Sequence, residues 1–144
     1  MAIEIENSFL VAYELNEHPG HLEARELLAQ ELSNKNTFAL CPQVLAEFIH
    51  VVTDSKRFEK PVPVAEALSR TERLWNAREI RKVYPSDDST ALFLHWMNVH
   101  GLGRKRILDT QLAALYYTAN VKEIATMDFR DFKIFDVFKI HTIG

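Results

Sequence analysis

The alternation of short apolar segments with longer segments of helical periodicity is the feature that most constrains the fold of this chain. Residues 2–5, 37–40 and 123–126 are short apolar runs, typical of buried strands. Apolar residues recur at helical spacing over residues 22–32, 42–52, 64–75, 91–99 and 107–117. Strands separated by helices predict an α/β fold with a mostly parallel central sheet and helices on both faces.

Local signals place the ends of several elements. Asn7 and Ser8 are both good N-cap residues, so a helix is expected to start there. Pro42 suits the first turn of the next apolar helix. Residues 80–84 and 137–143 alternate between outward and inward positions, which indicates an edge strand and a terminal strand. The strand count predicted from the sequence is therefore five.

Composition limits the class of protein. The 144 residues are 47% hydrophobic, which is enough apolar surface for one compact domain over residues 1–144. Cys41 is the single cysteine and is expected to be a small buried side chain. A formal charge of −3 argues against binding nucleic acid by bulk electrostatics alone, although local basic clusters remain available. With no long apolar run, we expect a cytoplasmic protein with no membrane partner.

Four acidic residues occupy similar places beside apolar segments. Glu6 and Asp128 each follow a predicted strand, while Glu47 and Asp109 lie near the starts of predicted helices. In a parallel sheet, ligands gather at the carboxyl ends of the strands. Carboxylate oxygens are hard ligands for Mg²⁺ or Mn²⁺, and a cation there would polarise a phosphodiester. The sequence thus predicts one shared acidic pocket that holds a divalent metal.

A simpler interpretation is that each acid caps a helix or is solvated in a turn, because acidic residues favour helix starts. This interpretation suits any one of the four taken alone. It is weaker for the group, since Glu47 and Asp109 lie among apolar neighbours, where a free carboxylate is costly. Other catalytic patterns are absent from the sequence: the histidines have no zinc spacing, and there is no nucleophile elbow or glycine-rich phosphate loop.

The acidic segments resemble, in order, the motifs of the PIN-domain family, and the resemblance spans nearly the whole chain. The matching stretches are residues 6–12, 41–47, 108–114 and 125–132. The resemblance implies a PIN-like three-layer α/β/α sandwich. More narrowly, it implies a VapC-type toxin of a toxin–antitoxin pair, a Mg²⁺- or Mn²⁺-dependent endoribonuclease that hydrolyses RNA. Its expected partners are an RNA substrate, a cognate antitoxin protein and a second copy in a homodimer.

The same resemblance implies roles for the acids. Glu6 and Asp109 would hold the main metal, and Asp128 and Glu47 would complete the site. Either Asp128 or Asp131 fits the fourth acidic position, and Asp128 is favoured, with Asp131 as a supporting or helix-capping residue. Two hydroxyls lie beside the acids and are candidates for ordering water or a phosphate oxygen, or else ordinary strand-end hydroxyls: Ser8 and Thr126.

One residue departs from the family pattern. The first acid of the family is nearly always Asp, and this chain has Glu6, whose extra methylene displaces the carboxylate while Mg²⁺ demands near-ideal octahedral geometry. Glu4 would share a strand face with Glu6, but the spacing to Phe9 fits Glu6 better. The substitution keeps an alternative open, namely a catalytically weak or inactive PIN-like module that binds RNA or a protein.

RNA phosphates beside four acids require cationic help. The basic segment Arg104, Lys105 and Arg106 precedes Asp109 directly and is the first candidate for RNA binding. A second basic group comprises Lys56, Arg57 and Lys60. For either group, a solvated loop with no role in binding is the competing interpretation.

Overall fold

A computed structural model of the chain describes residues 1–143. Within that range, five strands form one sheet in the order β3-β2-β1-β4-β5, and every neighbouring pair is parallel. The predicted mostly parallel sheet is therefore wholly parallel. The strands are β1 (Ala2–Ile5), β2 (Thr37–Leu40), β3 (Ile80–Lys82), β4 (Glu123–Thr126) and β5 (Lys139–Thr142).

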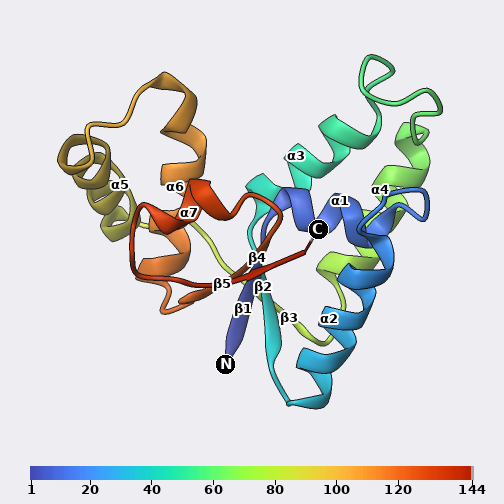
Figure 1. Ribbon diagram of the computed structural model, residues 1–144, viewed down its shortest axis with the longest axis horizontal. Coiled ribbons are helices and arrows are strands. Elements are labelled where there is room, and N and C mark those ends of the chain that lie inside the picture. The colour runs from blue at the N-terminus through green and yellow to red at the C-terminus, as the bar shows by residue number, and fades with distance from the viewer. Residues whose placement is uncertain (144) are drawn as a thin grey trace.

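Helices cover both faces of the sheet, as Figure 1 shows: α5 and α6 lie on one side, and α1 to α4 lie on the other. The fold is thus the three-layer sandwich expected from the sequence. The helices are α1 (Asn7–Glu14), α2 (His21–Ser33), α3 (Pro42–Val52), α4 (Val64–Trp75), α5 (Asp87–Val99), α6 (Ile107–Thr118) and α7 (Phe129–Lys133). A short 3-10 turn, η1 (Arg104–Arg106), leads into α6.

Some predicted boundaries were wrong. The edge strand ends at Lys82 rather than continuing through residue 84, and the terminal strand is confined to Lys139–Thr142. Both lie at the outside of the sheet, where a single neighbouring strand limits the pairing. Helix α1 begins at Asn7, but its N-cap is Glu6, not Asn7 or Ser8. Helix α7 was not predicted, because its five residues are too few to show a periodic pattern.

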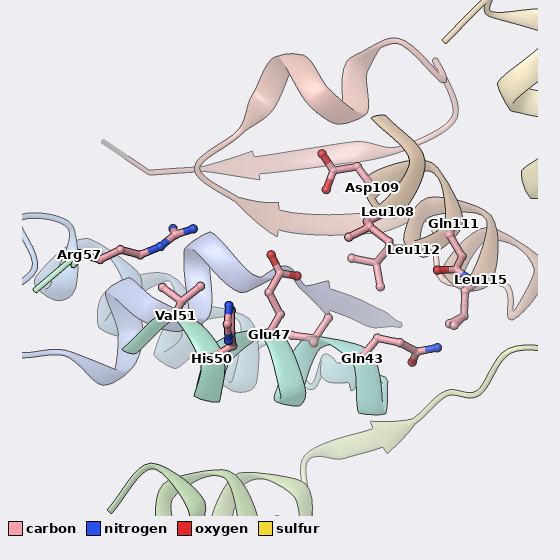
Figure 2. Close-up of a pocket in the computed structure, with 11 residues that line it drawn as sticks. Gln43, Glu47, His50, Val51, Arg57, Leu108, Asp109, Gln111, Leu112 and Leu115 are labelled. Atoms are coloured by element: carbon pink, nitrogen blue, oxygen red, sulfur yellow. The ribbon is translucent and has the colours of Figure 1, made fainter. Parts of the chain in front are cut away.

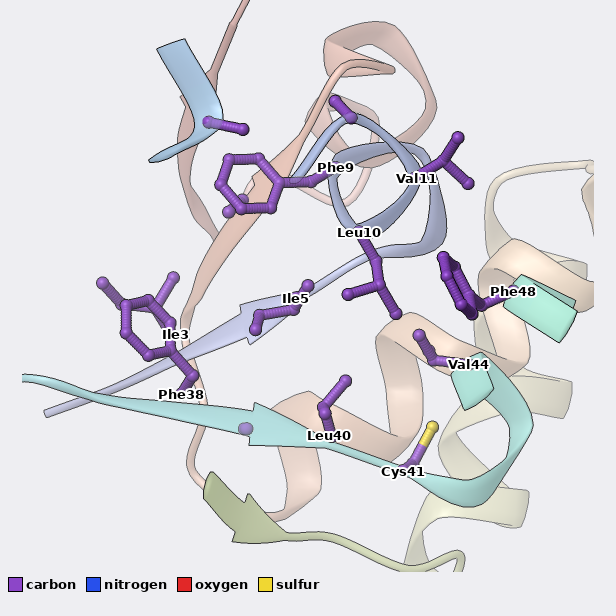
Figure 3. Close-up of a cluster of buried hydrophobic side chains, with 14 of the residues drawn as sticks. Ile3, Ile5, Phe9, Leu10, Val11, Phe38, Leu40, Cys41, Val44 and Phe48 are labelled. Carbon is purple, nitrogen blue, oxygen red and sulfur yellow. The ribbon is translucent and has the colours of Figure 1, made fainter. Parts of the chain in front are cut away.

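One side of the sheet packs on α1, α2 and α3 through a large apolar cluster (Figure 3). Ile3 and Ile5 of β1 and Phe38 of β2 are almost completely buried there, together with Phe9 of α1 and Phe48 of α3. Side chains alternate along a strand, so the residues between these isoleucines face the opposite side. This packing fixes the register of β1 and hence which way its glutamates point.

The opposite side of the sheet packs on α6. Ile124 of β4 contacts Ala113 and Ala114 of this helix in a second cluster. Trp96 joins that cluster by stacking on Phe135 at a ring-centroid distance of 4.7 Å, so this aromatic residue is part of the core. In residues 1–143, no helix is both long enough and apolar enough to cross a membrane.

Candidate functional site

The four predicted acids lie at the carboxyl edge of the sheet. Glu6 follows β1 directly, and Asp128 follows β4 by two residues. β1 and β4 are adjacent and parallel, so their carboxyl ends place these two acids at one edge. Helix α3 begins just after β2 and carries Glu47, and α6 carries Asp109 in its first turn. The fold brings Glu47 and Asp109 into one pocket, whereas Glu6 and Asp128 lie at the same edge but do not line it.

A pocket of about 310 Å³ lies between α3 and α6 at this edge. Figure 2 shows Glu47 rising from α3 toward the helix that carries Asp109, with the guanidinium of Arg57 directed toward Glu47. The walls are largely apolar and include Val51, Leu112 and Leu115. The pocket therefore combines two carboxylates and a cation within an apolar cleft.

Glu6 is nearly buried, with a 6% exposed fraction. Its Oε2 accepts a hydrogen bond of 2.6 Å from the backbone N–H of Ser8 and so caps α1. Burial raises the pKa of Glu6 to about 8; the Ser8 hydrogen bonds oppose this shift, and the neighbouring charges of Asp128 and Asp109 add to it. The carboxylate of Glu6 that is predicted to bind the metal is therefore also the N-cap of α1.

The two pocket acids are also perturbed. Loss of surrounding water raises the pKa of Asp109 to about 6; Asp131 raises it further, and Arg106 opposes the shift. The pKa of Glu47 is likewise raised by desolvation, while Arg57 lowers it. Mutual repulsion contributes in both cases, since Asp128 raises both pKa values. Acids whose pKa values are raised by one another share a region of negative potential, which favours a cation.

The two predicted hydroxyls join the ends of β1 and β4. Ser8 Oγ lies 3.3 Å from Thr126 Oγ1 and accepts a hydrogen bond of 2.9 Å from the N–H of Met127. Thr126 Oγ1 accepts one of 2.9 Å from the N–H of Asp128. These bonds hold the turn that carries Asp128 beside the start of α1. Burial raises the pKa of Asp128, and Asp131 adds to that effect.

The basic segment is divided by the structure. Arg106 donates a hydrogen bond of 2.9 Å to Asp131 Oδ1 and a second, short one to the carbonyl oxygen of Asp131. Arg104 and Lys105 are exposed to solvent. Asp131 therefore supports the position of Arg106 beside Asp109, and Arg106 is already engaged by protein. Asp128 and Asp131 consequently differ in surroundings, a distinction that sequence spacing left open.

Sequence reasoning missed two features of the site. His50 lines the pocket and lowers the pKa of Glu47. Its spacing of three residues from Glu47 on one helix was the signal that could have revealed it. Glu4 is completely buried, and Glu6 and Asp109 both add to the rise of its pKa that burial causes. The alternation of residues along β1 indicated which face of the sheet Glu4 lies on, but not that Glu4 is completely buried.

The donor chemistry suits a divalent metal, because carboxylates are hard oxygen ligands for Mg²⁺ and Mn²⁺. Within residues 1–143, no three His, Cys, Asp or Glu side chains are already grouped closely enough to hold an ion. Glu47 and Asp128 are exposed, so their side chains have room to change rotamer. The ligand atoms are therefore of the type that these metals prefer, and metal binding requires the carboxylates to move closer together.

Several solved structures share this fold. VapBC-1 from nontypeable Haemophilus influenzae superposes with a TM-score of 0.70 at 13% identity, covering 99% of this chain and 98% of that one. VapBC2 from Rickettsia felis, bound to a DNA fragment from its promoter, gives 0.66 at 20% identity over 100% of both chains. VapC20 from Mycobacterium tuberculosis, a toxin that cleaves the sarcin–ricin loop, gives 0.64 at 16% identity over 85% and 86%.

At these identities the structural likenesses establish the fold alone. No curated protein matches the chain. The family model of the PIN domain matches residues 3–137, which include all four acids and the elements that position them. This chain belongs to the PIN domain family.

Proposed function

We propose that this protein is a divalent-metal-dependent endoribonuclease and the toxin of a toxin–antitoxin pair. The observation that carries the proposal is the placement of four acids at one edge of a PIN-domain sheet, two of them facing each other across the pocket. The fold shared with VapBC complexes and with a VapC toxin supports the toxin assignment.

In this proposal Glu6, Asp109 and Asp128 hold Mg²⁺ or Mn²⁺, with Glu47 completing the site. The cation supplies Lewis-acid stabilisation for phosphodiester hydrolysis. Water forms a bond to phosphorus and loses a proton, while the ester bond to the leaving oxygen breaks and that oxygen gains a proton. Ser8 and Thr126 keep the Asp128 turn beside Glu6 through their hydrogen bonds. Asp131 holds Arg106 near Asp109; Arg106 lowers the pKa of Asp109, while Asp131 itself raises it.

RNA binding requires cations that are free to meet phosphates. Arg57 lines the pocket beside Glu47, and its side chain remains 61% exposed although it pairs with Asp54 at 3.5 Å. Arg104 and Lys105 lie exposed near the N-terminus of α6. We therefore assign phosphate contacts to these three residues, with Arg106 acting mainly through Asp131.

The expected protein partner is a cognate antitoxin. FitAB, another structural neighbour, was solved bound to a DNA fragment, and VapBC complexes share the fold. The mouth of the pocket carries Leu108, whose exposed fraction is 75%, next to the acidic residues. An apolar contact beside a negative potential suits a partner segment that carries apolar and basic side chains. We also propose that the protein forms a homodimer and is located in the cytoplasm.

A non-catalytic module that binds RNA or a protein is the second candidate. One observation in its favour is that Glu6 uses one carboxylate oxygen to cap α1. Another is that, in the described residues, no three His, Cys, Asp or Glu side chains are grouped closely enough to hold an ion. Calorimetric titration with Mn²⁺, followed by an RNA cleavage assay with Mn²⁺ or with EDTA, separates the two. Metal binding with cleavage that EDTA abolishes supports the nuclease. A protein that binds RNA but neither binds Mn²⁺ nor cleaves RNA is the module.

A further inference from the structure

Glu4 is a carboxylate buried in the centre of the sheet. Its exposed fraction is 0%, and it lies in the middle of β1, between β2 and β4. The register sets it beside Ala39 on one side and Ile124 on the other. Both neighbours are apolar, so neither side chain offers a hydrogen bond. A carboxyl group in such surroundings costs free energy unless something compensates it.

Neither carboxylate oxygen of Glu4 has a hydrogen-bond partner within residues 1–143. This is unusual, since most buried polar side-chain atoms are satisfied. Glu123 of the adjacent strand β4 provides the contrast. It is also buried, with an exposed fraction of 8%, but its Oε1 lies 2.8 Å from Nε2 of His141. Burial of a glutamate in this sheet therefore does not by itself leave it unpaired.

The position of Glu4 relates it to the acidic site. Alternation along β1 directs Glu4 and Glu6 to the same side of the sheet, which is the side that packs on α6. Asp109 lies in the first turn of this helix, and Tyr116 lies two turns further along it, completely buried. Burial raises the pKa of Glu4, and the neighbouring charges of Glu6 and Asp109 add to that rise. Glu4 is thus the innermost member of the acidic group.

Both carboxylate oxygens of Glu4 are buried and unpartnered in the described residues. Oε2 of Glu6, in contrast, accepts the backbone N–H of Ser8 in the cap of α1. We propose that Glu4 is an additional carboxylate ligand of the divalent-cation site, entering it from the buried side behind Glu6 and Asp109. The proposal rests on the metal-dependent function proposed above and adds a ligand that the family motifs do not include. Glu4 would also supply oxygen ligands at a site where one oxygen of Glu6 is already engaged by the cap of α1.

The test is calorimetric titration of the full chain with Mn²⁺ alone. Glu4→Gln keeps the shape and removes the charge, while Glu4→Met also removes the unpaired polar oxygens. Glu123→Gln is the matched control, because it alters a buried glutamate of the same sheet that is bonded to His141. We expect both Glu4 variants to lose about tenfold or more in Mn²⁺ affinity. The control is expected to bind as the parent does.

Thermal melting in EDTA shows whether the variants fold. Glu4→Met is expected to melt at or above the temperature of the parent, because it removes an unpaired buried carboxyl. Loss of Mn²⁺ affinity in a variant of equal or greater stability supports a ligand role. Parent-like Mn²⁺ affinity in both Glu4 variants overturns the inference and leaves the nuclease proposal standing. Absence of Mn²⁺ binding in the parent overturns both.

Crystals of the parent grown with Mn²⁺ give a reading that does not depend on any variant. An anomalous peak within bonding distance of the Glu4 carboxylate supports the inference. A peak bonded to Asp109 but not to Glu4 overturns it and retains the proposed metal site.

Discussion

Glu6 accepts the backbone N–H of Ser8 at 2.6 Å, so the first acid of the site is also the N-cap of α1. The extra methylene of glutamate, relative to the aspartate of the family pattern, is accommodated in a residue whose exposed fraction is only 6%. A change at this position therefore acts on the start of α1 and on the proposed metal site together.

Glu6→Asp tests the geometric cost of this arrangement. Aspartate is a favoured N-cap residue, so the variant retains a cap on α1. Its shorter side chain is expected to improve the octahedral geometry that Mg²⁺ requires and so to raise Mg²⁺-dependent RNA cleavage. Initial cleavage rates at matched Mg²⁺ concentrations measure the effect. A fall in rate, with the melting temperature unchanged, would show that the site is built around glutamate.

The raised pKa values predict how stability without metal depends on pH. Burial raises the pKa of Glu6 from 4.5 to about 8, and that of Asp109 from 3.8 to about 6. Between the unfolded and folded pKa values the native state binds more protons than the unfolded state, so stability falls as pH rises. In EDTA the melting temperature is expected to decrease from about pH 4.5 toward pH 8, and Glu6→Gln should flatten the decrease. A melting temperature that rises across this window would contradict the pKa assignments.

The fourth acidic position is tested by a matched pair of variants. Asp128→Asn removes an exposed carboxylate at the site and is expected to weaken Mn²⁺ binding. Asp131→Asn weakens the ion pair with Arg106, whose atoms lie 2.9 Å apart, and is expected mainly to lower stability, by about 1 kcal/mol or less. Calorimetry and thermal melting of both variants distinguish the roles. If Asp131→Asn lost more Mn²⁺ affinity than Asp128→Asn, the assignment would be reversed.

The divided basic segment predicts unequal effects on RNA binding. Replacing Arg104 and Lys105 by Ala is expected to weaken binding for all sequences and to lower the salt slope by about 0.7 for each lost single-strand contact. Arg106→Ala should lower thermal stability instead, because it breaks the pair with Asp131. Fluorescence titration of a short RNA with metal-free protein at several salt concentrations measures the slope. An unchanged slope in the double variant would exclude this segment and leave Arg57 as the remaining proposed phosphate contact.

Much of the architecture could be read from the sequence. The bounds of β1, β2 and β4 were predicted correctly, because each is an apolar run that ends at a polar or helix-starting residue. Their parallel pairing then placed Glu6 and Asp128 at one edge of the sheet. These features depend on local pattern and on general rules of chain topology.

The unpredicted features depend on contacts between distant parts of the chain. The pair of Arg106 with Asp131 joins residues 25 positions apart, so spacing alone assigned Arg106 to RNA. The enclosure of Glu4 depends on how distant segments pack over the sheet, which strand alternation does not specify. The cap at Glu6 was missed because Asn7 and Ser8 were stronger N-cap candidates by residue type.

Asp109→Asn tests the central claim most directly, since it removes one charge from the centre of the acidic site while keeping the side-chain shape. Its Mn²⁺ affinity and its Mn²⁺-dependent RNA cleavage should both fall sharply, with Glu123→Gln behaving as the parent. The measurement is paired calorimetry and cleavage on the same protein preparations. Unchanged Mn²⁺ binding and unchanged cleavage in Asp109→Asn would contradict the assignment of this pocket as a metal-dependent nuclease site.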